Sequence, residues 1–366
     1  MDLAIIGLPQ SGKTALFNAL ARSRAEGAPR ATGAPAPSLG VVPVPEPRLQ
    51  VLIGMFQPKK VVHATVKYVD LPAAPQDFGK GSGIAGPFLS ELSKADALLM
   101  LVRSFQDDRV PHFEGSVDPA RDLATLTLEM AFSDMAIIER RKLKIAGSLK
   151  GARAGEREAY RHEEALLDRI KASLEAEVPL REQSLTLEEA RIISGYRFLT
   201  AKPLMVVLNI DESRLPQAAV LEKEYNARYA RDKVQFIALC CKLEMELAEL
   251  GEEEAAEFRR ALCLAETPLD RLVQLSYRLL GLLFFFTVGS DEVKAWTVAR
   301  GTSALKAAGK IHTDIEKGFI RAEVVSFADL VKCGSLAEAR RQGVLRLEGK
   351  SYSVQDGDII TYLFNV

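Results

Sequence analysis

The sequence carries no excess of either charge and few of the residues that build metal sites or disulfide frameworks. Its 48 Lys and Arg residues nearly balance 49 Asp and Glu residues, so the formal net charge is −1. A general attraction to nucleic acid is therefore excluded, and any such contact must use a local basic patch. The four histidines are scattered. The four cysteines, at positions 240, 241, 263 and 333, fit neither a zinc spacing nor a disulfide framework, which predicts reduced thiols in a cytoplasmic protein.

Long apolar runs are missing as well. The longest, Leu279 to Val288, is about half as long as a membrane span. No secretory signal is recognisable, because an apolar strand begins almost at the first residue. We therefore expect no membrane partner. A chain of 366 residues predicts two or three domains and has ample length for a core.

The most informative segment that is present is LAIIGLPQSGKTALFNAL, residues 3–20. Gly7 to Thr14 fits the phosphate-binding pattern GxxxxGK[ST], with an apolar strand before it and a helix after it. In such a loop, backbone N–H groups wrap the phosphates, Lys13 reaches the β and γ oxygens, and the Thr14 hydroxyl binds Mg²⁺. A chance glycine-rich turn is the alternative. The predicted phosphate-binding residues are Gln10, Ser11, Gly12, Lys13, Thr14 and Ala15.

After this loop, short apolar runs alternate with more polar segments that are compatible with helices. The runs are Val66–Val69, Ala97–Val102, Leu204–Leu208 and Val234–Leu239. This alternation predicts a parallel sheet with helices on both faces, an α/β fold. Because ligands of such sheets bind at the carboxyl ends of the strands, the residues that follow each run are the candidates for chemistry.

Asp70 follows the second strand and is the candidate to hold Mg²⁺ through water. A strand-end cap is the alternative role. Phosphate-loop GTPases usually have Asp-x-x-Gly at this point, but here Ala73 takes the place of the glycine. The Cβ of alanine restricts a close approach of the backbone to the γ-phosphate.

The candidate base-binding residues follow the last two strands. Asn209-Ile210-Asp211-Glu212 stands where an Asn-Lys-x-Asp motif would read guanine, but the Lys is missing and the acid is Glu212. Guanine specificity is therefore not expected from this chemistry. Cys240, Cys241 and Lys242 stand where such proteins place a Ser-Ala-Lys loop against the base.

Further segments carry a resemblance to one family. They are GVVPVPEPRL at 40–49, the pattern FxDDxxxHxxGxVDPxRD at 105–122, and two C-terminal stretches at 293–326 and 345–366. With the phosphate loop, they make the chain resemble, nearly end to end, the YchF-type ATPases, the adenine-preferring members of the Obg branch of phosphate-loop GTPases. The C-terminal stretches are similar to the family's TGS domain, a small ubiquitin-like β-grasp module.

The resemblance implies that Asn209 and Glu212 form an Asn-x-x-Glu base motif and that ATP binds in preference to GTP. It also implies a catalytic histidine in a mobile loop, which here is His112. An exposed histidine can orient or deprotonate a water near neutral pH, although a plain surface residue is an equal alternative. Ala74 fits the family's lack of a water-positioning Gln.

Two positions depart from the family pattern. Ala34 replaces a Thr that would bind Mg²⁺ in the first switch, and Ala73 replaces the glycine described above. We therefore expect nucleotide binding to survive and hydrolysis to be slow.

Residues 126–200 predict two amphipathic helices folded back on each other near Gly147, Gly151 and Gly155. The family has a helical-hairpin insertion at this place. A basic tip with few acids would suit ribosomal RNA, whereas a solvated arm without a partner is the alternative. The cations assigned to the tip are Arg140, Arg141, Lys142, Lys144, Lys150, Arg153 and Arg157.

We therefore predict a phosphate-loop NTPase domain at 1–125 and 201–282, a helical hairpin at 126–200 and a TGS β-grasp domain at 283–366. The predicted function is a cytoplasmic, monomeric ATPase with Mg²⁺ as cofactor, which binds the ribosome or its RNA through the hairpin and the TGS domain. The alternatives are a nucleotide-gated scaffold that does not hydrolyse, a conventional GTP-binding protein and, less favoured, a metabolic kinase. A kinase would need an acceptor-binding lid, whereas the accessory parts here resemble interaction modules.

Overall fold

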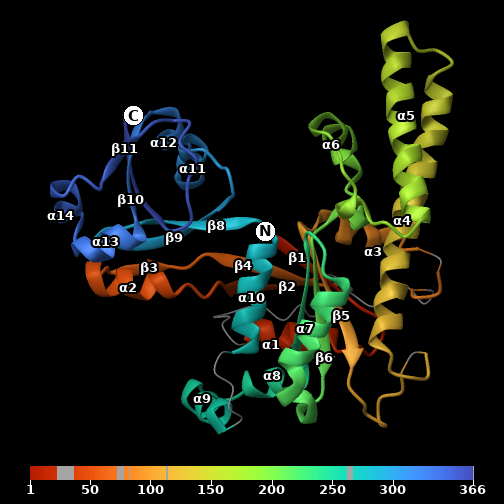
Figure 1. Cartoon of the computed structure of the whole chain (residues 1–366), viewed down its shortest axis with the longest axis horizontal. Coiled ribbons are helices and arrows are strands. Elements are labelled where there is room, and N and C mark those ends of the chain that lie inside the picture. Colours follow the sequence, from red (N-terminus) through yellow and green to blue (C-terminus); the bar gives the residue numbers. More distant parts are fainter. Residues whose placement is uncertain (23–36, 72–77, 82, 113, 262–266, 366) are drawn as a thin grey trace. The chain divides into compact units, whose positions relative to one another are not determined.

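The computed structural model describes residues 1–22, 37–71, 78–81, 83–112, 114–261 and 267–365 (Figure 1). The chain forms two compact units. Unit 1 comprises Met1–Val42 and Lys67–Leu269, and unit 2 comprises Pro43–Val66 and Asp270–Val366. The second unit therefore begins before position 283 and also takes in a segment from near the N-terminus. Among the described residues, none of the helices has the length and apolar character needed to cross a bilayer.

Unit 1 is built on a six-stranded sheet with the strand order β2-β4-β1-β5-β6-β7. Strands β4, β1, β5, β6 and β7 run parallel to one another. They coincide with the apolar strand predicted before the phosphate loop and with the four apolar runs that follow it, so the predicted parallel sheet is confirmed. The strands are β1 (Asp2–Ile6), β2 (Ser38–Pro43), β4 (Thr65–Asp70), β5 (Ala97–Ser104), β6 (Leu204–Ile210) and β7 (Val234–Leu239).

Helices pack on this sheet and enclose a core in which β5 and β6 are buried along their whole length. Fully buried strands of this kind need an apolar side chain on both faces, which explains why they read as continuous runs. The shorter helices of unit 1 are α1 (Lys13–Arg22), α3 (Gly86–Lys94), α6 (Leu187–Ile193), α7 (Ala218–Tyr229), α8 (Cys241–Leu247) and α9 (Glu252–Ala261). Short 3₁₀ helices lie at Leu180–Glu182, Ser194–Tyr196, Leu199–Ala201 and Glu212–Gln217.

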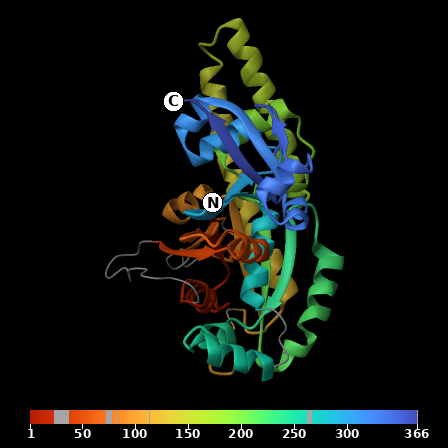
Figure 2. The ribbon, with the colours of Figure 1, turned by 90° about the vertical axis from the view of Figure 1, so that its left-hand side faces the viewer.

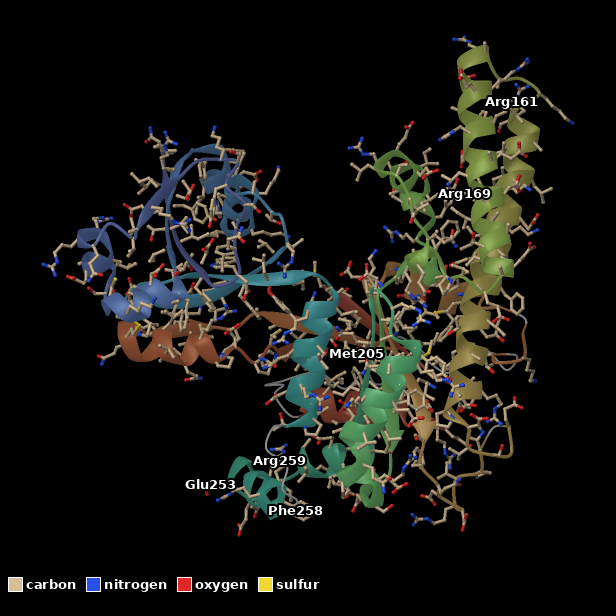
Figure 3. All side chains as sticks on the ribbon, viewed as in Figure 1. Arg161, Arg169, Met205, Glu253, Phe258 and Arg259 are labelled. Carbon is tan, nitrogen blue, oxygen red and sulfur yellow. The ribbon has the colours of Figure 1, made fainter. Side chains whose placement is uncertain are left out.

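Two long helices, α4 (Pro119–Ser148) and α5 (Ala154–Glu175), form the predicted hairpin and run side by side (Figures 1 and 2). Helix α4 begins where Asp118 accepts hydrogen bonds from the N–H groups of Ala120 and Arg121, directly before a proline at the first helical position. The distal half of α4 and α5 share an apolar core that includes Ile138, Ile145, Leu166 and Ile170. The helical periodicity of the sequence therefore marks the buried stripe.

Unit 2 contains a second six-stranded sheet with the order β11-β10-β12-β8-β9-β3. Strands β8 and β9 pair antiparallel, and the last strand, β12, inserts parallel to β8 and antiparallel to β10. This is the β-grasp arrangement, with α11 packed over the sheet. The strands are β3 (Lys60–Val62), β8 (Leu282–Thr287), β9 (Glu292–Ala299), β10 (Phe319–Ser326), β11 (Arg346–Glu348) and β12 (Asp358–Phe364). The helices are α2 (Pro47–Phe56), α10 (Pro268–Leu279), α11 (Ala304–Ile311), α12 (Thr313–Lys317), α13 (Phe327–Cys333) and α14 (Leu336–Arg341).

Contacts within unit 2 explain why residues 43–66 belong with the C-terminal segment. Strand β3 pairs with β9 in parallel. Arg48 donates to Glu46 at 2.7 Å and to Asp356 at 2.8 Å, and both carboxylates hold the pKa of the guanidinium above its ordinary value. The GVVPVPEPRL motif therefore ends in an ion-pair cluster with the C-terminal segment.

Candidate functional site: the phosphate loop

The phosphate loop connects β1 to α1 and lies directly on β5. A Cβ at Gly7 would come within 2.5 Å of the carbonyl oxygen of Leu101, and a Cβ at Gly12 within 2.4 Å of Nδ2 of Asn209. Gly12 also has a φ of 99°, a conformation that side chains disfavour. Both glycines are therefore required by the path of the loop, and the loop is held in shape before any ligand is bound.

Lys13 lies inside this loop, and no carboxylate of the described residues is within hydrogen-bond distance of it. Its Nζ donates to the carbonyl oxygens of Gly7 at 2.7 Å and Leu8 at 3.1 Å. Burial lowers the pKa of Lys13, and the nearby charge of Asp70 opposes that shift. Burial likewise raises the pKa of Asp70, with Lys13 acting in the opposite direction. A partly buried ammonium bonded to carbonyls keeps its full charge available to an incoming anion.

The residues predicted for Mg²⁺ have the chemistry that this cation requires. Thr14 is exposed in the first turn of α1, and Asp70 ends β4, the strand next to β1. Magnesium usually takes one or two protein oxygens and completes its shell with water and substrate phosphates. A hydroxyl and a carboxylate at one edge of the sheet are such a donor set. Among the described residues no cluster of three or more His, Cys, Asp or Glu could hold a metal, so a cage made entirely by the protein is not the alternative.

Asn209 ties the phosphate loop to the loop after β7. Its Nδ2 donates to the carbonyl oxygen of Ser11 at 2.9 Å, and its Oδ1 accepts from the N–H of Cys241 at 3.0 Å. The side chain is buried, which leaves little of the amide for a ligand. Of the two residues of the Asn-x-x-Glu motif, Asn209 therefore braces the site, and Glu212 is the exposed one that can face a base.

The Cys240-Cys241-Lys242 segment contacts the site through the backbone N–H of Cys241, which bonds to Asn209, and through the side chain of Lys242. Both thiols are buried, and burial raises their pKa values, most strongly for Cys241. The exposed Nζ of Lys242 lies 3.9 Å from Oε1 of Glu212. Ser11 is also buried, so it contributes backbone groups, while Gln10, with a φ of 63°, shapes the loop and Ala15 lies in the first turn of α1.

His112 is not the exposed loop residue that the sequence suggested. Its side chain is 5% exposed, and its Nε2 lies 2.9 Å from Oδ2 of Asp122 on α4. Its Nδ1 accepts a hydrogen bond of 3.0 Å from the N–H of Glu114. A neutral imidazole with Nε2–H donating to Asp122 satisfies both contacts, so neither nitrogen is available to a water in this arrangement. Asp122 is the last residue of the FxDDxxxHxxGxVDPxRD pattern at 105–122, but the sequence analysis assigned it no role.

Arg103 is a second residue that the sequence analysis missed. It lies buried at the end of β5, in register with Asn209, and donates to the carbonyl oxygens of Phe105 and Val110. Its guanidinium stacks on the Phe105 ring at 4.4 Å, and burial lowers its pKa. Arg103 therefore holds the loop that leads to His112. A single cation at the end of the apolar run ALLMLVRS was the available signal.

The cations of the hairpin do not all gather at its tip. Arg141 makes two hydrogen bonds to Glu163, at 2.8 and 2.7 Å, and Lys142 pairs with Asp168. The expectation of few acids was therefore wrong, because the acids come from α5, 22 residues along the chain from Arg141 and 26 from Lys142. Arg140, for its part, lines a cavity with the end of α3. Five of the seven cations are exposed and have no ion pair among the described residues: Arg140, Lys144, Lys150, Arg153 and Arg157.

Comparison with known proteins is consistent with this architecture. A family model for the YchF GTPase C-terminal region, described as a protein of unknown function (DUF933), matches residues 282–365. The ribosome-binding ATPase YchF of Bacillus subtilis (strain 168) is 39% identical over all of both chains. The chain belongs to the YchF family. A second relative of the same name, from Haemophilus ducreyi, is 38% identical over 99% of this chain and 98% of its own.

The YchF fold has also been seen in a solved structure that covers nearly the whole chain. The Schizosaccharomyces pombe YchF GTPase superposes with a TM-score of 0.84 at 30% identity, over 99% of this chain and 97% of its own. The predicted fold class, a phosphate-loop domain with a helical hairpin and a β-grasp domain, is thereby confirmed. The two departures from the YchF pattern, Ala34 and Ala73, lie outside the described residues, as does Ala74, which was expected to fit that pattern.

Proposed function

We propose that this YchF-family protein is a cytoplasmic ATPase that binds ATP with Mg²⁺ in the phosphate loop, hydrolyses it slowly to ADP and phosphate, and associates with the ribosome. Two full-length relatives bear the name ribosome-binding ATPase YchF. The observation that carries the proposal is the preformed loop around Lys13, whose ammonium has two carbonyls as its partners in the part of the chain that the structure describes. We expect the protein to be a monomer.

The loop supplies the binding energy through its own groups. Lys13 would leave the carbonyls of Gly7 and Leu8 and bond the β and γ oxygens, while N–H groups from Gln10 to Ala15 cradle the phosphates. Thr14 and Asp70 would hold Mg²⁺, Asp70 through water, and the cation would neutralise charge on the β and γ oxygens when bound.

Adenine in preference to guanine follows from the residues around the base. Ile210 is buried in β6, where a guanine-reading motif would carry a lysine. Glu212 is left as the acidic group, close to Lys242. In competition binding at equal Mg²⁺, ATP should displace labelled ATP more effectively than GTP does. Converting Ile210 to Lys and Glu212 to Asp should move the preference toward guanine, whereas a wild-type preference for GTP would contradict the proposal.

Hydrolysis without an activator should be roughly 10⁻³ s⁻¹ or slower, at or below the norm for phosphate-loop GTPases. The bonded state of His112 supports a slow basal rate, since a water can reach the imidazole only after the contact with Asp122 or Glu114 opens. Single-turnover hydrolysis with and without ribosomes tests this. His112→Ala should lower the stimulated rate without lowering ATP affinity. Undetectable hydrolysis under both conditions would favour the alternative, a nucleotide-gated scaffold.

Ribosome association would use the hairpin together with the β-grasp domain. Phosphate contacts release counterions, so co-sedimentation with ribosomes should weaken steeply with salt. Reversing three of the unpaired cations, Lys144, Lys150 and Arg157, to Glu should reduce co-sedimentation, whereas Lys223→Glu, an exposed change on α7, serves as the control. If the triple reversal leaves co-sedimentation unchanged, the hairpin is not an RNA-binding arm.

A further inference from the structure

A cavity of about 660 Å³ lies in unit 1 at the opposite end of the sheet from the phosphate loop. The residues that precede β5, β6 and β7, among them Asp96, Lys202 and Lys233, line one side of it, and the segment 180–198 lines the other. We call it the amino-end cavity. Its volume is in the range of small-molecule sites, and a neighbouring cavity of about 460 Å³ shares Lys94 and Arg197 with it.

The lining of the amino-end cavity is strongly basic. Its one carboxylate, Asp96, already accepts a hydrogen bond of 2.9 Å from the N–H of Asp2. Arg197 and Lys233 are exposed at the rim and have no ion pair among the described residues. The five cations of the lining are Lys94, Arg181, Arg197, Lys202 and Lys233. Of these, Lys94 is already paired with Glu91 on α3, at 2.6 Å. A concave surface with this excess of positive charge attracts anions.

Two of these cations are bonded in the same way as Lys13. Lys202 Nζ donates to the carbonyl oxygens of Ser93, at 3.1 Å, and Ala95, and Arg181 donates to those of Thr200, at 3.1 Å, and Lys202, at 3.2 Å. Arg181 is 7% exposed, and its Nε–H has no hydrogen-bond partner in the described part of the chain. Burial lowers the pKa of Arg181 to about 10 and also lowers that of Lys202. Neither cation has an ion pair among the described residues, and the charges of nearby carboxylates, Asp134 for both cations, Glu182 for Arg181 and Asp96 for Lys202, only oppose these pKa shifts.

We propose that the amino-end cavity binds a small phosphate ester of about mononucleotide size. The cations would receive the phosphate, and the accessible apolar side chains of the wall, Leu185, Ala190 and Ala201, would cover the organic part. Sites for single-stranded RNA use exposed aromatic rings as stacking platforms. The aromatic residue of this lining, Phe198, is buried in the core, so a small ligand fits better than an RNA strand. This site is separate from the ATP site and does not depend on the proposed function.

The test is calorimetric titration of the full-length protein with the phosphate loop saturated by ADP and Mg²⁺. The probes are inorganic tripolyphosphate, ribose 5-phosphate and AMP. The variant is Arg197→Asn with Lys233→Asn, because both positions have positive φ, 52° and 64°, which asparagine tolerates. A control of equal charge is Lys223→Asn with Arg228→Asn, both exposed on α7.

We expect ADP-saturated wild type to bind at least one probe, and the rim variant to bind it at least about tenfold more weakly, as for the loss of charge-assisted hydrogen bonds. The control should bind as wild type does. Tripolyphosphate measures the contribution of charge alone. Ribose 5-phosphate or AMP should bind more tightly than its smaller charge would predict, because the apolar wall contacts its organic part. Absence of binding under ADP saturation overturns the proposal, as does an equal loss in the control. Binding of an RNA oligonucleotide with none of the small probes also overturns it, in favour of an RNA contact.

Discussion

The cations at the two ends of the unit 1 sheet and those on the hairpin bond to different partners. Lys13 at the carboxyl end, and Lys202 at the amino end, donate to backbone carbonyls. On the hairpin, Arg141 donates to Glu163 and Lys171 to Glu139. A carbonyl leaves the charge of its donor uncompensated, whereas a carboxylate cancels it. The comparison teaches that the partner of a cation, and not its presence in the sequence, indicates whether it is available to a phosphate.

The largest effect that this comparison predicts is at the phosphate loop. Lys13→Ala removes a desolvated cation from the β and γ oxygens and should weaken ATP binding by about 2–4 kcal/mol. Calorimetry with ATP and Mg²⁺ measures the loss. The matched control is Lys142→Ala, which removes a lysine that is paired with Asp168 on the hairpin. Its ATP affinity should equal that of wild type; an unchanged affinity in Lys13→Ala would refute the assignment of the loop.

The next effect concerns Asp134, which joins the hairpin to the core of unit 1. Its carboxylate accepts from the N–H groups of Leu199 and Thr200, both at 2.8 Å, and from the Thr200 hydroxyl at 2.6 Å. Burial raises its pKa to about 6, against the lowering effect of these donors. A carboxyl group with a raised pKa binds its proton more tightly in the folded protein. Its contribution to stability is therefore full below about pH 4 and is lost as the pH rises through about 6.

Asp134→Asn should remove this dependence. The difference in unfolding free energy between wild type and variant should change by about 2–3 kcal/mol between pH 4 and pH 7, with wild type relatively more stable at pH 4. Urea unfolding at both pH values measures it. Thr200→Val should move the transition to higher pH, since it deletes a donor to the ionised form. A difference that does not vary with pH would show that Asp134 does not titrate in this range.

Part of this architecture is predictable from the sequence. What separates the predictable features from the others is whether they depend on local residue types or on contacts that the fold creates. Strands β1, β5 and β6 are mainly continuous apolar runs, β4 and β7 are apolar with one polar residue inside each, and the phosphate loop has glycines at the positions where no Cβ fits, so both features follow from local residue types. The pairing of Arg141 with Glu163 and of His112 with Asp122 depends on which residues the fold brings together. Residue type gives no signal for such contacts, and this is why a paired cation and a bonded histidine were both expected to be free.

A smaller effect is expected at the hairpin itself. Arg141→Met should lower the unfolding free energy by about 1–3 kcal/mol, because it breaks a two-bond ion pair and leaves the buried carboxylate of Glu163 with the Tyr196 hydroxyl as its remaining partner. Lys144→Met, an exposed change three residues away, should stay within about 0.5 kcal/mol. Chemical denaturation compares the two. An equal loss in both variants would remove the distinction between paired and unpaired cations on this helix.

The smallest predicted effect tests the comparison between carbonyl-bonded and carboxylate-bonded cations at a residue for which location and partner lead to opposite predictions. Lys242 lies at the carboxyl end of the sheet, as Lys13 does, but it faces carboxylates, Glu212 at 3.9 Å and Glu246 at 3.8 Å. If the bonding partner of a cation determines whether it can bind phosphate, Lys242 is not a phosphate ligand, although it lies at the same end of the sheet as Lys13. Exposed ion pairs contribute about 0.2–1 kcal/mol, so Lys242→Ala should change ATP affinity by less than about fivefold, while Lys13→Ala changes it far more. Because Lys242 neighbours Glu212, the small change should appear in the ratio of ATP to GTP affinity and not in the affinity for tripolyphosphate. If Lys242→Ala strongly weakens the binding of ATP, GTP and tripolyphosphate alike, the location of a cation matters more than its ion pairs. The same conclusion would then apply to the cations of the hairpin.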